Sequence, residues 1–189
     1  MNAAAMPRNT RSRLPLIMIA LVCIAPMVAA YIAFEYFPRD SRTNYGTLLM
    51  TEAPALTGTA LDGKPFALAD LKGRWVVLTA APGSCDAVCT AALYATRQAR
   101  TIQGRERDRV TRVWLVTDAA PPAPALVAEH PDLEIVRAPA NALASWPQGD
   151  NVIYLVDPLG NEVLAWPREP DIKALAKDLT KLLHASQIG

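Results

Sequence analysis

An uncharged apolar run near the N-terminus constrains this chain more than any other feature. It covers 21 residues, from Leu14 to Phe34, with the sequence LPLIMIALVCIAPMVAAYIAF. About 20 apolar helical residues are needed to cross the hydrocarbon core of a bilayer, so this run is long enough to span one. We therefore expect a short segment, residues 1–13, followed by a transmembrane anchor over residues 14–37.

The charges that flank this run indicate its orientation. Three arginines and no acidic residue precede it, whereas basic and acidic residues are mixed beyond it. Because basic residues favour the cytoplasmic side, we expect a cytoplasmic N-terminus and an exported C-terminal domain, which in a bacterium would be periplasmic. A cleaved signal peptide ending near Ala30 is the alternative, although the run is longer than a typical signal-peptide core.

The exported part of the chain is close to neutral. Residues 38–189 carry 16 Lys and Arg against 17 Asp and Glu, so nucleic-acid binding through many basic side chains is not expected. Two cysteines, Cys85 and Cys89, lie in this part, in a compartment where disulfides persist. We expect a linker over residues 38–53 and a folded exported domain over residues 54–189.

Short apolar runs predict the secondary structure of this domain. WVVLTAA, VWLVT and VIYLV are rich in β-branched residues and short enough to be buried strands. The order ββαβαββα around a small sheet predicts a mixed-sheet α/β sandwich. The charged stretch RERDRVTR predicts a solvated helix end or loop. The predicted strands are Trp75–Ala81, Val113–Thr117, Leu133–Arg137, Val152–Val156 and Glu162–Trp166, after a hairpin at Asp62-Gly63, and the main helices are Ser84 to about Gln103 and Asp171–His184.

Two cysteines after the first buried strand are the candidate reactive groups. A Pro-Gly turn ends the strand, Ser84 is the predicted N-cap, and Cys85 and Cys89 open the helix. In a first turn, unpaired amide groups and the helix dipole would stabilise a thiolate at Cys85. Cys89, one turn further on, would resolve a mixed disulfide. The negative charge of Asp86 opposes a thiolate.

The residues alone leave other interpretations of this pair open. One is a structural disulfide, although so short a loop gives little stabilisation, and another is a pair of reduced cysteines in the core. Two thiolates also suit a soft ion such as Cu(I). A peroxidase would need an activating Arg, Thr or Gln, and the local sequence PGSCDAVC offers only Ser84. His130 and His184 are expected at the surface, and Asp118 would either orient a proton or cap a loop.

Several segments resemble the SCO/SenC proteins in their order and spacing. They are LTGTALDGKPFALADLKGRWVVL, the C-x-x-x-C of Cys85 and Cys89, VWLVTD and YLVDPLG, and together they cover Pro54 to His184. This family consists of membrane-anchored, thioredoxin-fold proteins that take part in copper delivery and thiol reduction for cytochrome c oxidase assembly. The resemblance implies a thioredoxin-like sandwich preceded by one transmembrane helix.

The chain departs from this family at its site. The family's copper site uses both cysteines and a histidine about five residues before the tyrosine of the YLVDP-like strand. Here that count from Tyr154 falls on Gly149. Asn151 stands about where thioredoxin-like proteins carry a cis-proline, and Ala87 and Thr90 occupy the neighbourhood of the family's two prolines.

The resemblance implies a membrane-anchored thiol–disulfide oxidoreductase-like protein that acts in assembly of the copper centre of cytochrome c oxidase. Cys85 and Cys89 would carry the exchange without a required cofactor. The partners would be an oxidase subunit or other assembly factors, with the membrane bound through the N-terminal helix. The alternatives are a chaperone that holds Cu(I) on Cys85 and Cys89, and a redox-inert assembly scaffold without turnover, so catalysis stays an open hypothesis.

Overall fold

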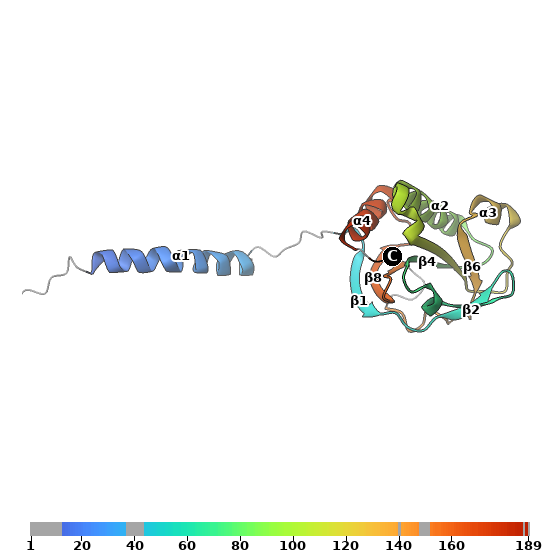
Figure 1. Cartoon of the computed structure of the whole chain (residues 1–189), viewed down its shortest axis with the longest axis horizontal. Coiled ribbons are helices and arrows are strands. Elements are labelled where there is room, and N and C mark those ends of the chain that lie inside the picture. Colours follow the sequence, from blue (N-terminus) through green and yellow to red (C-terminus); the bar gives the residue numbers. More distant parts are fainter. Residues whose placement is uncertain (1–12, 37–43, 140, 148–151, 187, 189) are drawn as a thin grey trace, which may run out of the picture. The chain divides into compact units, whose positions relative to one another are not determined.

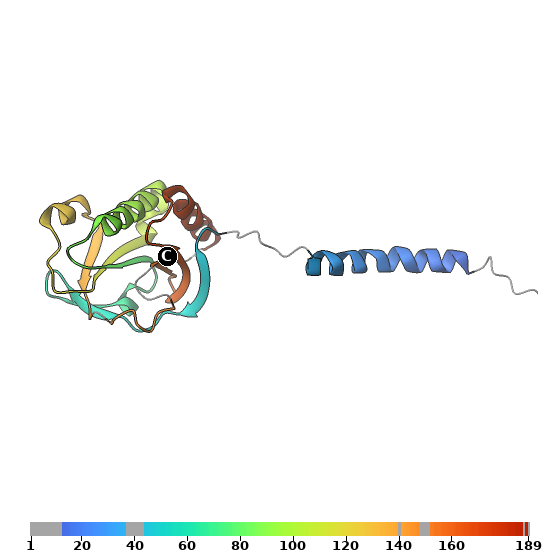
Figure 2. The ribbon, with the colours of Figure 1, turned by 180° about the vertical axis from the view of Figure 1, so that it is seen from behind.

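The computed structural model describes residues 13–36, 44–139, 141–147, 152–186 and 188. The chain divides into two compact units, residues 1–43 and 44–189. Figure 1 shows both units along the chain, and Figure 2 shows them from behind.

A single apolar helix, α1 (Leu14–Tyr36), makes up the described part of the first unit. Its stretch Leu14–Ala33 has a mean hydropathy of 2.6 and is long and apolar enough to cross a membrane. The helix contains Pro26, which a spanning helix tolerates, and Cys23 is exposed on it as a free thiol. A signal sequence would pass the same length and composition test, so the helix alone does not distinguish an anchor from a signal.

The second unit is built on an eight-stranded mixed sheet with the strand order β1-β8-β7-β4-β5-β6-β2-β3. The predicted α/β fold with a mixed sheet is therefore confirmed. The strands are β1 (Thr47–Glu52), β2 (Thr57–Ala60), β3 (Pro65–Ala67), β4 (Trp75–Ala81), β5 (Val110–Val116), β6 (Leu133–Arg137), β7 (Val152–Val156) and β8 (Asn161–Pro167). The α-helices are α2 (Ala87–Ile102), α3 (Pro124–Glu129) and α4 (Ile172–Ala185), and η2 (Leu68–Leu71) and η3 (Gly104–Arg109) are 3₁₀ helices.

The centre of the sheet is made of parallel strands. β4 pairs in parallel with β5 along its whole length, from Trp75 opposite Val110 to Ala81 opposite Val116, and β5 pairs in parallel with β6. β7 runs antiparallel to β4 on the other side. Every residue of β4, β5 and β7 is buried. This explains why two of these strands are continuous apolar runs rather than alternating patterns.

Each face of the sheet supports its own core. Val76 and Leu78 face a cluster completed by the connecting segments, including Leu68 of η2. Val77 faces the opposite cluster, to which α4 contributes Leu175 and Leu179. In both views, α2 and α4 lie on the same side of the sheet (Figure 1, Figure 2). The amphipathic pattern of the last predicted helix therefore corresponds to its contact with the sheet.

One strand lies inside the segment expected to be a linker. β1 falls within residues 38–53 and pairs antiparallel with β8, with Thr47 opposite Ala165. Residues 47–52 of the expected linker therefore form a strand of the sheet, which was not among the predicted strands. β1 is an edge strand in which all residues except Leu49 are exposed. It therefore lacks the alternation of apolar and polar residues that would have indicated a strand.

Arg112 lies inside β5, so the prediction of a solvated helix end or loop is wrong for this residue. Its side chain is 1% exposed and ties three elements together. Nη2 donates to the carbonyl of Leu93 in α2 at 2.7 Å, Nη2 and Nε donate to Thr96 Oγ1, and Nη1 faces Asp132 Oδ1 at 3.3 Å. Burial lowers the pKa of Arg112 to about 10, while Asp132 opposes this shift, so the guanidinium is charged at neutral pH.

Glu162 in β8 is a fully buried acid, with 0% of the residue exposed. Its Oε2 accepts a hydrogen bond from Thr51 Oγ1 of β1 at 3.4 Å, and Oε1 has no hydrogen-bond partner among the described residues. Burial raises the pKa of Glu162 to about 6, against the lowering effect of Thr51. The folded protein therefore holds this proton more tightly than the unfolded chain does.

We expect Glu162→Gln to stabilise the fold at pH 8 but not at pH 4. Between the unfolded pKa near 4.5 and the folded value of about 6, the wild-type carboxyl loses stability as pH rises. The neutral amide avoids this loss, which we place at about 2 kcal/mol. Thermal unfolding of the full chain in detergent at both pH values measures the difference, with the exposed Glu169→Gln as control. An equal effect of Glu162→Gln at pH 4 and pH 8 would contradict the assignment.

Candidate functional site

The cysteine site lies where β4 ends and α2 begins. After Ala81 the chain turns, and the N–H of Cys85 donates to the carbonyl of Pro82 at 3.1 Å. Cys85 has a φ of +42°, in the left-handed region, so it precedes the helix. The N-cap is Asp86, whose Oδ1 accepts the N–H of Cys89 at 2.8 Å. The prediction of Ser84 as N-cap, with Cys85 in the first turn, is therefore wrong.

The reason for this shift is local. The turn from Pro82 to Cys85 keeps the backbone out of the helical region, and an aspartate caps a helix as well as a serine does. Asp86 was expected only to oppose a thiolate by its charge. In the structure its carboxylate is also the group that starts the helix.

Cys85 and Cys89 are joined by a disulfide, with their Cα atoms 5.2 Å apart. The two cysteines differ in their access to solvent. Cys85 is partly exposed, whereas Cys89 is buried with 0% of the residue exposed. A reagent from solvent therefore approaches the disulfide at the Cys85 sulfur.

An apolar cluster supports the buried sulfur. Cys89 packs with Leu93 of the same helix and with Trp114 and Val116 of β5, and Val127 of α3 packs against this cluster. Trp114 Nε1 donates to the carbonyl of Ala81 at 3.3 Å. Trp114 thus has the core-packing role expected for the strand aromatics. The surroundings of Cys89 disfavour a charged sulfur, because little solvent reaches it.

Asp118 fixes the loop that presents the cysteines. Its Oδ1 accepts the N–H of Gly83 at 2.8 Å and the N–H of Ala120 at 3.2 Å. A Cβ atom at Gly83 would come within 2.0 Å of the Ala120 carbonyl oxygen, so only glycine fits this approach. Of the two roles left open for Asp118, the structure shows the capping of a loop.

Thr90, noted in the sequence only as a departure from a family proline, contacts the disulfide directly. Its Oγ1 lies 3.8 Å from Cys85 Sγ and donates to the carbonyl of Asp86 at 2.9 Å. The position of Thr90 in the sequence could have identified it. A threonine directly after the second cysteine lies in the first turn of the helix, next to the residues that precede it.

The two histidines have different surroundings. His184 is exposed near the end of α4, as predicted, but His130 is 2% exposed, so its prediction as a surface residue is wrong. Burial lowers the pKa of His130, and the charges of Arg112 and Arg97 lower it further, which keeps the imidazole neutral. Among the described residues, no group of three or more His, Cys, Asp or Glu is arranged to hold a metal. The departures at Gly149 and Asn151 lie outside the described residues.

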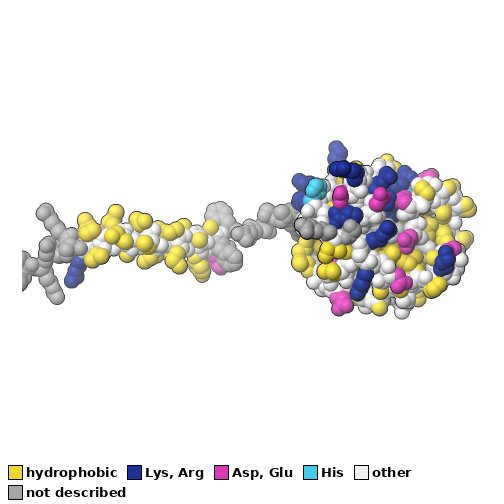
Figure 3. Space-filling view, in the orientation of Figure 1, with side chains coloured by type: hydrophobic (Ala, Val, Ile, Leu, Met, Phe, Trp, Pro, Cys, Tyr) yellow, Lys and Arg dark blue, Asp and Glu magenta, His cyan; other side chains and the backbone are white. Residues whose placement is uncertain are grey.

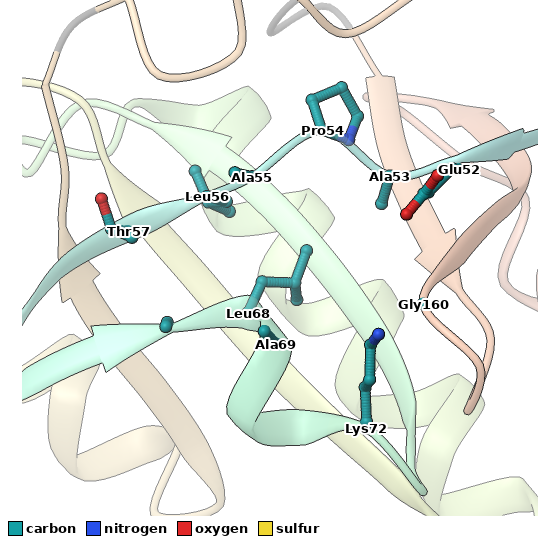
Figure 4. A pocket seen from close by; sticks show the side chains of 11 residues that line it. Glu52, Ala53, Pro54, Ala55, Leu56, Thr57, Leu68, Ala69, Lys72 and Gly160 are labelled. Atoms are coloured by element: carbon teal, nitrogen blue, oxygen red, sulfur yellow. The ribbon is translucent and has the colours of Figure 1, made fainter.

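The described pocket in Figure 4 has a volume of about 260 Å³ and is separate from the cysteines. It lies between the β1–β2 connection, η2 and the β7–β8 turn, and Lys72 extends into it. Lys72 and Gly160 place the pocket near the first residue of β4, whereas Cys85 follows the last residue of that strand. Across the face shown in Figure 3, basic and acidic side chains of the second unit are interspersed, in line with its near-neutral charge.

Comparison with known families identifies the fold of this site. Residues 75–186 match the family model described as the transmembrane-like, thioredoxin-like, C-terminal domain. The chain belongs to this family. The match begins with β4, includes both cysteines and ends just after α4. The thioredoxin-like fold expected from the sequence is confirmed.

Solved structures with the same fold include Sco proteins and a thiol–disulfide oxidoreductase. Copper-bound ScoI of Arabidopsis thaliana has a TM-score of 0.60 and 18% identity, covering 72% of this chain and 100% of that chain. BsSco, a member of the Sco family of cytochrome c oxidase assembly proteins with a disulfide switch, has a TM-score of 0.57 and 15% identity, covering 75% and 96%. The thioredoxin domain of an oxidoreductase from Bacteroides vulgatus has a TM-score of 0.53 and 21% identity, covering 72% and 99%. No curated protein sequence matches the chain.

We expect Asp118→Ala to lower the free energy of unfolding by about 1–2 kcal/mol, because it leaves two backbone N–H groups near the site unpaired. Asp118→Asn keeps an acceptor oxygen and should cost less than half as much. Thermal unfolding of the full chain in detergent checks both values. If the asparagine variant is as unstable as the alanine variant, the two hydrogen bonds are not the reason.

Proposed function

We propose that this chain is a membrane-anchored thiol–disulfide exchange protein that acts in assembly of the copper centre of cytochrome c oxidase, with Cys85 and Cys89 as its redox pair. One observation carries the proposal. The disulfide lies at a strand-to-helix turn and joins the partly exposed residue Cys85 to the buried residue Cys89. A purely structural bridge has no need of this asymmetry.

The exchange follows from this asymmetry. A thiolate of a dithiol substrate attacks Cys85 Sγ, the disulfide bond breaks, and its electron pair leaves on Cys89 Sγ, which takes up a proton. The second substrate thiolate then attacks the substrate sulfur of the mixed disulfide. The substrate disulfide forms and Cys85 leaves as a thiolate. Two electrons have passed from the substrate to the cysteine pair, and the reverse sequence reduces a substrate disulfide.

The role in oxidase assembly is supported by the Sco structures that share this fold. BsSco belongs to a family of cytochrome c oxidase assembly proteins and contains a disulfide switch. Its fold and its paired cysteines are features that the present chain also has. We infer that the partners are the copper-binding cysteines of an oxidase subunit or another assembly factor.

The location completes the proposal. Residues 14–37 anchor the protein, residues 1–13 remain in the cytoplasm, and the folded domain is exported. The three arginines before α1 support this orientation. The Cys85–Cys89 disulfide also fits an exported domain, because such bonds persist in oxidising compartments.

We expect Cys89→Ser to trap a mixed disulfide that the wild-type chain resolves. The reduced full chain in detergent, with Cys23 replaced by serine, is incubated with oxidised glutathione and examined by mass spectrometry. Cys89→Ser should accumulate one glutathione at Cys85. Cys85→Ser should form about tenfold less adduct, because Cys89 is buried. Equal adducts on both variants, or none on either, would argue for a redox-inert scaffold.

A Cu(I) chaperone is the second candidate function. The copper-bound ScoI structure has the same fold, and reduction of the disulfide here would release two sulfurs, donors that suit Cu(I). Copper would then be cargo held by Cys85 and Cys89. The described residues supply no further ligand in a cluster with them.

An anaerobic Cu(I) titration of the reduced full chain, against a competing chelator, tests this second function. If the chain is a chaperone, it binds one Cu(I), and Cys85→Ser with Cys89→Ser abolishes binding. His130→Ala is the control and should leave binding unchanged, because His130 is not grouped with the cysteines. Stoichiometric Cu(I) binding without glutathione exchange would favour the chaperone over the exchange protein, and the absence of binding would exclude the chaperone.

A further inference from the structure

We propose that the hydroxyl of Thr90 stabilises the thiolate of Cys85 in the reduced protein and so sets the reactivity of the exposed sulfur. This inference rests on the proposed exchange function. It starts from the position of Thr90 Oγ1, 3.8 Å from Cys85 Sγ. This distance is within hydrogen-bonding range for sulfur while the disulfide is still intact.

The hydroxyl is free to turn toward the sulfur. In the disulfide form it donates to the carbonyl of Asp86 at 2.9 Å. The same carbonyl also accepts the backbone N–H of Thr90 at 2.9 Å, so it keeps a partner when the hydroxyl leaves. A threonine hydroxyl rotates at little cost. A thiolate accepts a charge-assisted hydrogen bond, which is stronger than a bond to a neutral carbonyl.

The other groups around Cys85 do not favour a thiolate, so the hydroxyl of Thr90 is important for its stability. Cys85 precedes the N-cap, so it is not enclosed by the first helical turn, where amide groups would stabilise its charge. The carboxylate of Asp86, the next residue, repels a thiolate. Its Oδ1 accepts the N–H of Cys89, so this N–H is already paired. Thr90 supplies an uncharged donor on the side of Cys85 where the helix starts.

The chemical role is limited to a hydrogen bond. Thr90 keeps its proton, and no covalent bond to Thr90 forms or breaks. Stabilising the thiolate makes Cys85 a better leaving group in the mixed disulfide and stabilises the reduced protein relative to the disulfide. Thr90 is thus a residue that tunes the exchange, in direct contact with the reacting sulfur.

The chain offers a matched control in the same helix. Thr101 Oγ1 donates to the carbonyl of Arg97 at 2.8 Å, which is the same contact, four residues back, that Thr90 makes with Asp86. Both threonines are exposed and lie in α2. Thr101→Val therefore removes an equivalent hydroxyl and hydrogen bond near the other end of the helix.

The test measures the alkylation rate of Cys85 by iodoacetamide against pH. It uses the full chain in detergent after reduction, and mass spectrometry resolves each peptide so that Cys23 does not contribute. We expect Thr90→Val to move the midpoint of the profile upward by about one pH unit, as for the loss of a hydrogen bond to a charged group. Thr90→Ser should retain the wild-type midpoint, and Thr101→Val should leave it unchanged.

The equilibrium with reduced and oxidised glutathione gives a second readout. Thr90→Val should shift it about threefold to tenfold toward the protein disulfide, because the reduced form loses its stabilised thiolate. If Thr90→Val fails to fold, Thr90→Ala provides the same test. An unchanged midpoint in the folded Thr90 variants, or an equal shift in Thr101→Val, would overturn the inference. Failure of the exchange function would appear separately, as the absence of a glutathione adduct on Cys89→Ser.

Discussion

The parallel pairing of β4 with β5 is the interaction on which the site depends. Because the two strands are in register from Trp75 to Ala81, they end side by side. The turn after β4 carries the cysteines, and the turn after β5 carries Asp118. The hydrogen bond from Gly83 to Asp118 is possible only because the strand pairing brings these turns together, whereas the bond from Ala120 to Asp118 lies within one turn. The burial of both strands makes this arrangement rigid.

The sequence predicts the buried part of the fold well and its surface strand poorly. β4, β6 and β7 have the predicted bounds, since burial on both faces or at one face leaves a clear apolar pattern. β1 gives no such signal, because it is an exposed edge strand held by backbone hydrogen bonds to β8. Arg112 is hidden for a different reason. A basic residue inside a charged run indicates solvent, and only the packing of α2 and Asp132 around it explains its burial.

The site is predictable in its residues but not in its geometry. The spacing of Cys85 and Cys89 after a buried strand is enough to single them out. The backbone that leads into Cys85 depends on a turn at Pro82 and on a positive φ at Cys85. Residue type does not predict this φ, because cysteine rarely adopts it. The N-cap therefore moves from Ser84 to Asp86. The contact of Thr90 with Cys85 depends on the same turn, which places Cys85 beside the first turn of the helix.

The small size of the ring closed by the disulfide has a consequence for the folded domain. Only three residues lie between Cys85 and Cys89, so the bond restricts the unfolded chain less than a bond that closes a long loop. The two extensive cores that pack against the sheet lie elsewhere, and the bond contributes little to holding them together. In the proposed exchange, the bond that breaks and re-forms would be the one that closes a single turn at the start of α2.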